Sequence, residues 1–296
     1  MTATQDERPE GARVTMAMIG SSTGEVAVRW DERDVMLYAL GVGAGLGAPE
    51  EELHFTTENS GGVTLQVVPS FVSVLTMAAS PPAMSSLDDG RFLHAEQRFD
   101  LPTPLPVSGE AIVVNRIEQV LDKGSGAIVV NHASLRSADD GRLLADVRSS
   151  IFVRGAGGFD GPRGDFAEWT PPDRPADAEV VQQTRVEQAL LYRLSGDRHR
   201  LHSDPAFARI GGFDRPILHG LCTYGVACRA LVQGAAGDDP ARLRGMNGRF
   251  LKPVAPGDTL TTQIWRGGDG QILFRTRDGA GDVVLDRGAA TLDTDP

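Results

Sequence analysis

The feature of this sequence that most restricts its fold is an internal duplication. Val35–Gly45 (VMLYALGVGAG) matches Ala189–His199 (ALLYRLSGDRH), with a tyrosine and a leucine at equivalent places. Further along each copy, an Arg-Phe pair is followed by a proline and then by glycine and an acidic residue, within Arg98–Glu110 and Arg249–Asp258. A chain of 296 residues is also long for one hydrophobic core. The sequence therefore predicts two copies of one folding unit.

Both copies show the same order of expected elements: a short helix, a longer apolar helix and then a series of strands. The longer helices are expected at Val68–Ala79 and Ile217–Gln233. After them, apolar and polar residues alternate with the period of two that indicates half-buried strands. The alternating segments are Ala111–Val120, Gly126–Leu135, Arg142–Val153, Thr259–Trp265, Gln271–Arg277 and Val283–Leu292. Helices that come before an antiparallel sheet are typical of the α+β class.

Small residues are concentrated in both longer helices. Small side chains allow a helix backbone to approach a sheet closely, as a helix wrapped inside a curved sheet requires. These residues are Gly220, Gly225, Ala227, Cys228 and Ala230 in the second copy, and Ser70, Ser73, Ala78 and Ala79 in the first. We therefore expect an α+β chain of two tandem hotdog folds, a double hotdog, in which each antiparallel sheet wraps around a central helix.

One break divides the chain. From Gly155 to Ala178 the sequence is rich in glycine, proline and charge, and it has neither a helical nor a strand period. Such a segment is typical of a connection between domains. The predicted boundaries are an N-terminal hotdog at residues 1–155, a linker at 156–179 and a C-terminal hotdog at 180–296.

The charge and the cysteine content exclude several classes of protein. A formal net charge of -11 argues against a surface that binds nucleic acid or anionic lipid, so an anionic ligand would need a local basic pocket. Cys222 and Cys228 do not make a disulfide framework and suit a reducing compartment. No apolar run is long enough to span a bilayer, and the polar start, Met1–Glu10, does not have the pattern of a secretory signal. A cytoplasmic protein without nucleic-acid or membrane partners is expected.

A polar cluster in the second copy, Ser195–Pro205 (SGDRHRLHSDP), could carry chemistry. Asp197 and His202 lie five residues apart, which would separate them by roughly 140° on a regular helix. Gly196 and Pro205 indicate an irregular loop instead, where the two side chains can converge. A carboxylate and an imidazole at one site can transfer protons near neutral pH. On chemistry alone, a helix-capping turn with solvated histidines remains an equally simple interpretation.

A second candidate element follows at Pro216–Gly225 (PILHGLCTYG). Proline and glycine at the start of a helix leave backbone N–H groups that have no acceptor inside the helix. Such groups can donate to a carbonyl oxygen that gains negative charge during a reaction. A core helix that merely begins with proline would have the same pattern, so these residues alone do not decide between the two.

Taken together, these segments resemble the signature of the hydratase 2 or MaoC-like enoyl-CoA hydratases, in particular their two-hotdog type. The similarity rests on Tyr192–Asp197, Leu201–His202, Asp204–Pro205 and Pro216–Gly225. It extends over nearly the whole chain through Leu93–Gln97, Leu121–Gly126, Gly155–Phe159 and Arg249–Pro253. Several long motifs in the same order make the match more specific than any short pattern.

The resemblance implies reversible hydration of trans-2-enoyl-CoA to (R)-3-hydroxyacyl-CoA in fatty acyl-CoA metabolism. An acyl-CoA thioester is then the ligand, a homodimer is the expected assembly, and neither a cofactor nor a metal is needed. The implied catalytic pair is Asp197 and His202. The backbone of Gly220 would donate to the thioester oxygen, with His199 in support of the pair.

Substrate contacts are expected at positions that match the family and in the loop of the catalytic pair. They are His94, Ala95, Lys123, Arg198, Arg200, Leu201 and Phe250. A contact between Lys123 and a CoA phosphate is also expected without the resemblance, because a phosphate needs a local cation on a protein with this much negative charge. A lysine in a Lys-Gly-Ser-Gly hairpin turn is the simpler interpretation of that residue taken by itself.

The sequence departs from the family pattern at two places. The family usually has Gly-Asp-x-Asn-Pro-Leu-His, whereas this chain has His199 and Arg200 in place of the asparagine and the proline. A neutral His199 can still donate and accept one hydrogen bond, but it can become charged at about pH 6.5. In the first copy, Gly43 stands where Asp197 would be, and the longer helix has no His-Gly pair. We expect that copy to hold the acyl chain rather than to catalyse.

Three other functions stay open. A zinc-dependent hydrolase would need ligands with the spacing of His199, His202, His219 and Cys222. Hotdog proteins also include thioesterases, which would release free CoA from the same thioester. If His199 prevents catalysis at this site, the protein would be a non-catalytic module that binds acyl thioesters. Product analysis separates hydrolysis from hydration, and turnover separates an enzyme from a binding module.

Overall fold

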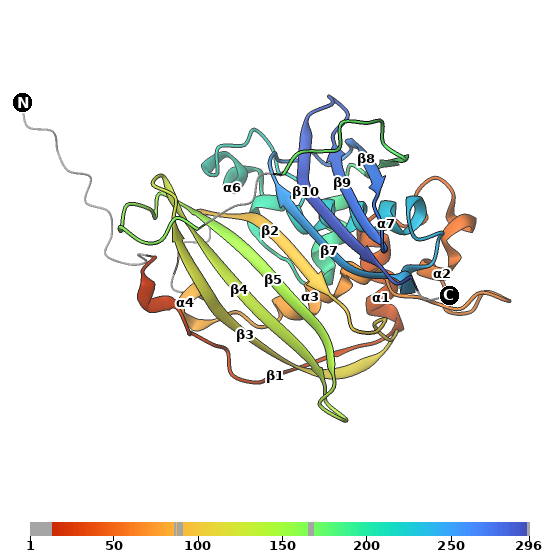
Figure 1. Cartoon of the computed structure of the whole chain (residues 1–296), viewed down its shortest axis with the longest axis horizontal. Coiled ribbons are helices and arrows are strands. Elements are labelled where there is room, and N and C mark those ends of the chain that lie inside the picture. The colour runs from red at the N-terminus through yellow and green to blue at the C-terminus, as the bar shows by residue number, and fades with distance from the viewer. Residues whose placement is uncertain (1–13, 86, 88–90, 165–168, 295–296) are drawn as a thin grey trace, which may run out of the picture.

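Antiparallel strands build one continuous sheet in the computed structural model, which describes residues 14–85, 87, 91–164 and 169–294 (Figure 1). In chain order the strands are β1 (Val26–Trp30), β2 (Phe92–Asp100), β3 (Gly109–Asp122), β4 (Gly126–Ser137), β5 (Leu143–Arg154), β6 (Ala178–Gln183), β7 (Leu243–Phe250), β8 (Thr259–Arg266), β9 (Gln271–Arg277) and β10 (Val283–Leu292). Across the sheet their order is β1-β3-β4-β5-β2-β7-β10-β9-β8-β6. The first and second copies of the sequence duplication therefore form the two halves of one sheet.

The two halves meet at β2 and β7. These strands pair in antiparallel register from Glu96 opposite Arg249 to Asp100 opposite Gly245. Next to the junction, Arg249 forms an ion pair with Asp286 on β10 at 2.7 Å. Because both halves place their remaining strands outward from this pair, one half repeats the arrangement of the other.

The strands predicted from alternation are all present, as β3, β4, β5, β8, β9 and β10. Alternation does not mark β2, β6 or β7. In β7, Gly245 and Gly248 interrupt the pattern, since glycine has low strand propensity. A Cβ on Gly248 would lie 3.0 Å from Leu285 of the neighbouring strand, so the glycine allows close packing there. β6 begins at Ala178, inside the segment predicted as the linker.

Helices lie against one face of the sheet (Figure 1). The longer helix of the second copy, α7 (Gly220–Gly234), packs on β6, β7, β8 and β2, and α3 (Val72–Met77) packs on β3, β4 and β5. Both are shorter at the start than predicted. Leu218 N–H bonds to the carbonyl of Val254, so the chain before α7 is extended and not helical. Before α3, Pro69–Phe71 forms a 3-10 turn.

The short helices of the two copies are α1 (Glu32–Gly41) and α5 (Gln188–Tyr192). α1 begins at a capping box, in which the side chains of Asp31 and Asp34 each accept from the other residue's backbone N–H. α5 continues into a 3-10 turn at Arg193–Ser195 and then leaves helical structure. The short helix of the second copy therefore ends before Asp197, and the irregular loop expected from Gly196 follows it.

One of the small residues of α7, Gly225, serves a different contact from the predicted one. We expected them to bring the helix close to the sheet, but a Cβ on Gly225 would collide with Val42 and lie 2.9 Å from the Tyr38 hydroxyl. Gly225 therefore lets α7 approach α1 of the other copy. At the end of α7, a Cβ on Gly234 would lie 2.6 Å from Ile264, so the sheet is approached closely there.

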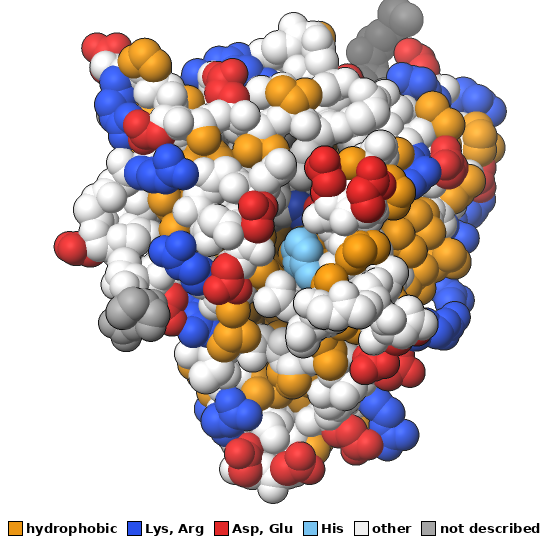
Figure 2. Space-filling view, turned by 90° about the vertical axis from the view of Figure 1, so that its right-hand side faces the viewer, with side chains coloured by type: hydrophobic (Ala, Val, Ile, Leu, Met, Phe, Trp, Pro, Cys, Tyr) orange, Lys and Arg blue, Asp and Glu red, His pale blue; other side chains and the backbone are white. Residues whose placement is uncertain are grey.

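The surface carries charges of both signs. Acidic and basic side chains are interspersed on the face seen in Figure 2, with apolar side chains gathered toward one edge of it. Inside, one hydrophobic core runs through both halves of the described chain, from Trp30 on β1 to Leu292 on β10. No helix among the described residues has the length and apolar character to cross a membrane.

Candidate active site

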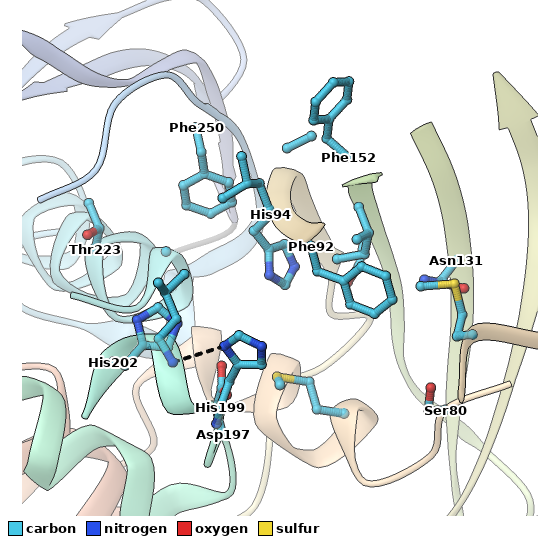
Figure 3. A pocket seen from close by; sticks show the side chains of 18 of the residues that line it. Ser80, Phe92, His94, Asn131, Phe152, Asp197, His199, His202, Thr223 and Phe250 are labelled. Carbon is cyan, nitrogen blue, oxygen red and sulfur yellow. Dashed lines mark hydrogen bonds between the residues drawn. The ribbon is translucent and has the colours of Figure 1, made fainter. Parts of the chain in front are cut away.

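A cavity of about 780 Å³ receives residues from both halves of the molecule. The second copy contributes the loop after α5, the start of α7 and the end of β7, and the first contributes α3 and strands β2 to β5. Much of the lining is apolar, including Phe92, Phe152 and Phe250 (Figure 3). A largely apolar cavity with a few polar groups is typical of a site for a small organic ligand.

Asp197 lies where the chain turns out of the 3-10 turn at Arg193–Ser195. The turn passes through Gly196, whose φ of 137° is strained for any residue with a side chain. The Asp197 carboxylate accepts a hydrogen bond from the N–H of His199 at 3.2 Å, which fixes the loop locally. The side chain is half-buried and lines the cavity, so this is the irregular loop expected from the sequence.

His202 ends a second short 3-10 turn, Arg200–His202, and also lines the cavity. Its Nδ1 is 2.9 Å from the carbonyl oxygen of Ile217. Because a carbonyl can only accept, Nδ1 carries the proton, and the neutral ring keeps Nε2 as its basic nitrogen. This is the tautomer that a general base requires.

The fold brings Asp197 and His202 together with a third group, His219. One ligand atom from each of the three lies within 4.8 Å of the others. The imidazoles of His202 and His219 stack with their centroids 3.8 Å apart. His219 is buried, and its Nε2 donates to the backbone carbonyl of Asp197 at 3.1 Å. His219 therefore holds the loop of Asp197 and supports the ring of His202.

The zinc site suggested by spacing is not assembled. Cys222 donates to the carbonyl of Gly41 at 3.3 Å, and burial raises the pKa of its thiol, which disfavours the thiolate that zinc binds. Asp197, His202 and His219 are ligand types that a metal accepts. One nitrogen of each of these two imidazoles bonds to a backbone carbonyl, an arrangement that also occurs in metal-ligating histidines. The group that the fold assembles is therefore Asp197, His202 and His219, and not the predicted His/Cys set.

The ionisation of the pair follows from its surroundings. Burial alone would raise the pKa of Asp197, but the imidazoles of His219 and His202 and the N–H of His199 outweigh it, so the pKa lies below its usual value. Burial lowers the pKa of His202 below 6.5, against the opposing effect of Asp197. Burial likewise lowers the pKa of His219, to about 3. At neutral pH the site therefore holds a carboxylate beside neutral imidazoles.

Gly220 is the first residue of α7 and lines the cavity. Its N–H lies at the helix start, where no carbonyl inside the helix can accept from it and where the helix dipole is positive. A Cβ here would lie 3.4 Å from the ring of Phe250 and 3.5 Å from Cβ of His94. The missing side chain leaves this space beside the N–H open to a ligand oxygen.

The predicted substrate residues fall into two groups. His94, Ala95, Leu201 and Phe250 line the cavity together with Gly220. The other three lie outside the cavity and stay predictions, since a CoA moiety would extend beyond it: Lys123, Arg198 and Arg200.

Each of the outer cations has its own surroundings. Lys123 donates to the backbone carbonyl of Arg163. It is in the turn between β3 and β4, at the end of the sheet where β2 begins. The guanidinium of Arg200 pairs with Asp204 at 2.6 Å, and Arg198 is exposed.

His199 lies at the edge of the pair and lines the cavity. Its Nδ1 accepts a hydrogen bond from the N–H of Leu201 at 3.3 Å and so caps the turn that carries His202. Its ring packs edge-on against Phe207. The side chain of asparagine can also accept such a hydrogen bond and cap a turn. This shared ability explains how His199 can stand where the family has asparagine.

Two families match the sequence, one in each half. The MFE-2 hydratase 2 N-terminal domain matches residues 29–155, and the MaoC like domain matches residues 167–289. The 3-hydroxyacyl-thioester dehydratase Y of Mycobacterium tuberculosis is 45% identical over 92% of this chain and 96% of its own length. The chain belongs to the MaoC-like hydratase 2 family. The resemblance predicted from the motifs is thus confirmed.

Other relatives of this MaoC-like hydratase 2 chain agree with the assignment. The peroxisomal enoyl-CoA hydratase 2 of Arabidopsis thaliana is 36% identical over 86% of the chain and 87% of its own length. The crystal structure of a MaoC-like dehydratase from Phytophthora capsici has a TM-score of 0.83 and 30% identity, over 95% of this chain and 99% of that one. The predicted α+β double hotdog is confirmed. The cytoplasmic location stays a prediction.

Proposed function

We propose that this chain catalyses the reversible syn addition of water to a trans-2-enoyl-CoA, giving the (R)-3-hydroxyacyl-CoA. The observation that carries the proposal is the half-buried pair of Asp197 and His202 beside the open N–H end of α7, in one largely apolar cavity. Its named relatives are hydratases and dehydratases of such thioesters. The substrate is an acyl-CoA thioester within fatty acyl-CoA metabolism, and the enzyme is a hydro-lyase.

The pair can run the reaction by proton transfer. A water held between the Asp197 carboxylate and Nε2 of His202 gives up one proton to the pair while its oxygen bonds to the β-carbon. The pair returns one proton to the α-carbon, so the two hydrogens of water end on the new hydroxyl and on the α-carbon. The pair regains its starting state. Dehydration is the same sequence in reverse.

Gly220 acts on the thioester oxygen. As the β-carbon is attacked, electron density moves to this oxygen and the intermediate resembles an enolate. The Gly220 N–H and the positive end of α7 stabilise that charge, and they are already in place before the reaction. His94 and Phe250, which flank the space beside Gly220, confine the thioester.

The parent protein assayed on crotonyl-CoA and on a longer trans-2-enoyl-CoA tests the proposal. Hydration removes the conjugated double bond, so the ultraviolet absorbance of the enoyl thioester falls while no free thiol appears. Release of free CoA would instead indicate the thioesterase alternative. Binding without either change would indicate the non-catalytic module. Activity that is lost to a chelator and restored by zinc would indicate the metal-dependent hydrolase.

The pH dependence should follow His202. The reaction needs neutral His202 and ionised Asp197, and the pKa values of both lie below their usual values. We therefore expect kcat/KM to fall only as the pH drops below 6.5, when the ring of His202 takes up a proton.

The variant His199→Asn should keep or raise kcat and should show the same fall of kcat/KM with pH, because asparagine can replace the acceptor that caps the turn.

The comparison of the two profiles assigns the ionisation. If His199 takes part in proton transfer, the parent should show an additional ionisation in kcat that is missing from His199→Asn. An inactive but folded His199→Asn variant beside an active parent would also contradict the passive role. The double variant His199→Asn with Arg200→Pro restores the usual family sequence of the loop and serves as the reference for both measurements.

We further propose that the chain forms a homodimer through the surface around α5 and β6. Val186, Leu190 and Leu194 are exposed there, Val186 to 79%. Val181 is also exposed on β6, which is the last strand at this end of the sheet. Large apolar side chains beside a sheet edge favour burial against a partner.

Light scattering should give the mass of a dimer for the parent protein, and the double variant Leu190→Glu with Leu194→Glu should give the mass of a monomer. A monomeric parent would contradict this.

A further inference from the structure

A row of four polar side chains crosses the inner face of the N-terminal half of the sheet, and three of them, Asn115, Asn131 and Ser149, line the cavity. Asn131 on β4 is opposite Ser149 on β5, and Ser149 is opposite Gln97 on β2. Asn115 on β3 shares their face, because it is two residues from Ile117, the partner of Asn131. Most other inward positions on these strands are apolar; His94 of β2, opposite Ile151, is a further polar one.

Part of the row is satisfied within the protein. Ser149 Oγ donates to Gln97 Oε1 at 2.6 Å, and Gln97 Nε2 donates to Ser73 Oγ of α3 at 3.0 Å. Asn115 Nδ2 donates to the carbonyl of Ala79 at 2.9 Å. Since a carbonyl only accepts, this bond also fixes the orientation of the Asn115 amide and identifies its other atom as the oxygen.

Two acceptors in the row are left over. Oδ1 of Asn115 and Oδ1 of Asn131 are buried and have no hydrogen-bond partner among the described residues. The two residues are only 9% and 8% exposed, and both line the cavity. A buried acceptor without a hydrogen-bond donor is unfavourable, because it has lost its hydration without gaining a partner. On the cavity wall, the oriented oxygen of Asn115 and the neighbouring amide of Asn131, which no hydrogen bond within the described part of the chain orients and which can therefore turn its oxygen either way, together indicate a ligand group that donates a hydrogen bond.

The position of these acceptors shows which part of a ligand reaches them. In Figure 3, Asn131 and Ser80 lie on the side of the cavity away from Asp197 and His202, with Phe92 between them. Neighbouring strands are about 4.8 Å apart, so Asn131 is roughly 10 Å across the sheet from β2, which carries His94. A thioester bound at the catalytic pair would therefore reach the two asparagines with its acyl chain.

We propose that the two asparagines bind a hydroxyl group on the acyl chain, so that the preferred substrates are hydroxylated enoyl thioesters. This inference rests on the proposed hydratase function. A hydroxyl donates to the free Oδ1 atoms, whereas a methyl end leaves them unsatisfied and a ketone offers no donor. An ammonium group would lose its hydration beside Ile151 and Phe92 without gaining a carboxylate.

A series of ω-hydroxy trans-2-enoyl-CoA thioesters, each paired with the chain in which methyl replaces the hydroxyl, tests this. In the parent, kcat/KM should favour the hydroxylated member about tenfold at the chain length that spans the cavity. Asn131→Leu should abolish or reverse this preference, because leucine favours the methyl end. Asn59→Leu, the same change on an exposed loop outside the cavity, should leave the ratio unchanged.

Calorimetric Kd values for the same thioesters separate two kinds of failure. If methyl chains are hydrated and bound as well as hydroxylated ones at every length, this inference is overturned while the proposed function stands. If nothing is hydrated but the hydroxylated chains bind about tenfold more tightly, the hydratase function fails and the hydroxyl site stands. The comparison within the parent needs no variant, so it holds even if Asn131→Leu does not fold.

Discussion

Replacing Asp197 by asparagine, or His202 by alanine, is expected to lower kcat for the hydration of crotonyl-CoA by about 10²–10⁴. Asparagine keeps the size of the carboxylate and its place in the loop but can no longer take up a proton. Alanine removes the only basic nitrogen that His202 offers, since Nδ1 is bound to the carbonyl of Ile217. The measurement is the loss of ultraviolet absorbance of the enoyl thioester at saturating substrate.

The chain contains a matched control for this experiment. On the sheet, His132 of β4 pairs with Asp146 of β5 at 2.6 Å, which is the same combination of groups outside the cavity. Asp146→Asn and His132→Ala should keep kcat close to the parent value. A folded Asp197 or His202 variant that also keeps the parent kcat would show that the pair does not carry the proton transfers. Circular dichroism spectra verify that each variant is folded.

The position of Asp197 and His202 on the cavity could be predicted because its determinants are local in the sequence. Gly196 and Pro205 mark a break in helical structure, and the structure shows two short turns there with Asp197 and His202 on the cavity. Gly220 followed from the family resemblance and not from the helix signal, because the start predicted at Ile217 lies three residues before the observed one. The strands β3 to β5 and β8 to β10 followed from alternation, which is also local in the sequence.

Features that depend on contacts between distant segments could not be predicted. The junction of β2 with β7 joins residues from different copies, and neither strand alternates regularly. His219 had only the spacing of a metal ligand, and its bond to the Asp197 carbonyl depends on how two loops meet. The asparagines of β3 and β4 occupy inward positions of alternating segments. A polar residue in the apolar phase of a strand is the signal that could have found them.

The first copy lacks a catalytic pair, and the structure shows what stands in its place. Gly43, the counterpart of Asp197 in the sequence duplication, lies beside Arg229, to whose guanidinium a Cβ would come within 3.3 Å. This guanidinium donates to both carboxylate oxygens of Glu52 and, at 3.0 Å, to the carbonyl of Val42. Glu52 also accepts from the N–H of Gly45 at 2.7 Å. The ion pair of Arg229 and Glu52 thus occupies the place in the first copy that corresponds to the site of Asp197 in the second.

Because Arg229 is buried, its loss should cost far more than that of a surface arginine. Arg229→Met keeps the apolar part of the side chain but leaves Glu52 and the Val42 carbonyl without their donor. We expect the free energy of unfolding in urea to fall by about 3–5 kcal/mol. As a control, Arg29→Met breaks an exposed ion pair in which Arg29 lies 2.6 Å from Glu110. This variant should change the free energy of unfolding by less than about 1 kcal/mol.

The penalty in Arg229→Met comes mainly from the carboxylate that is left unpaired, and a second change can isolate that contribution. Adding Glu52→Gln removes the charge while the amide oxygen can still accept from Gly45. The double variant should therefore be more stable than Arg229→Met alone, even though it carries one more substitution. If the two losses simply add, the ion pair does not couple α7 to this loop, and the burial of Arg229 reflects packing alone.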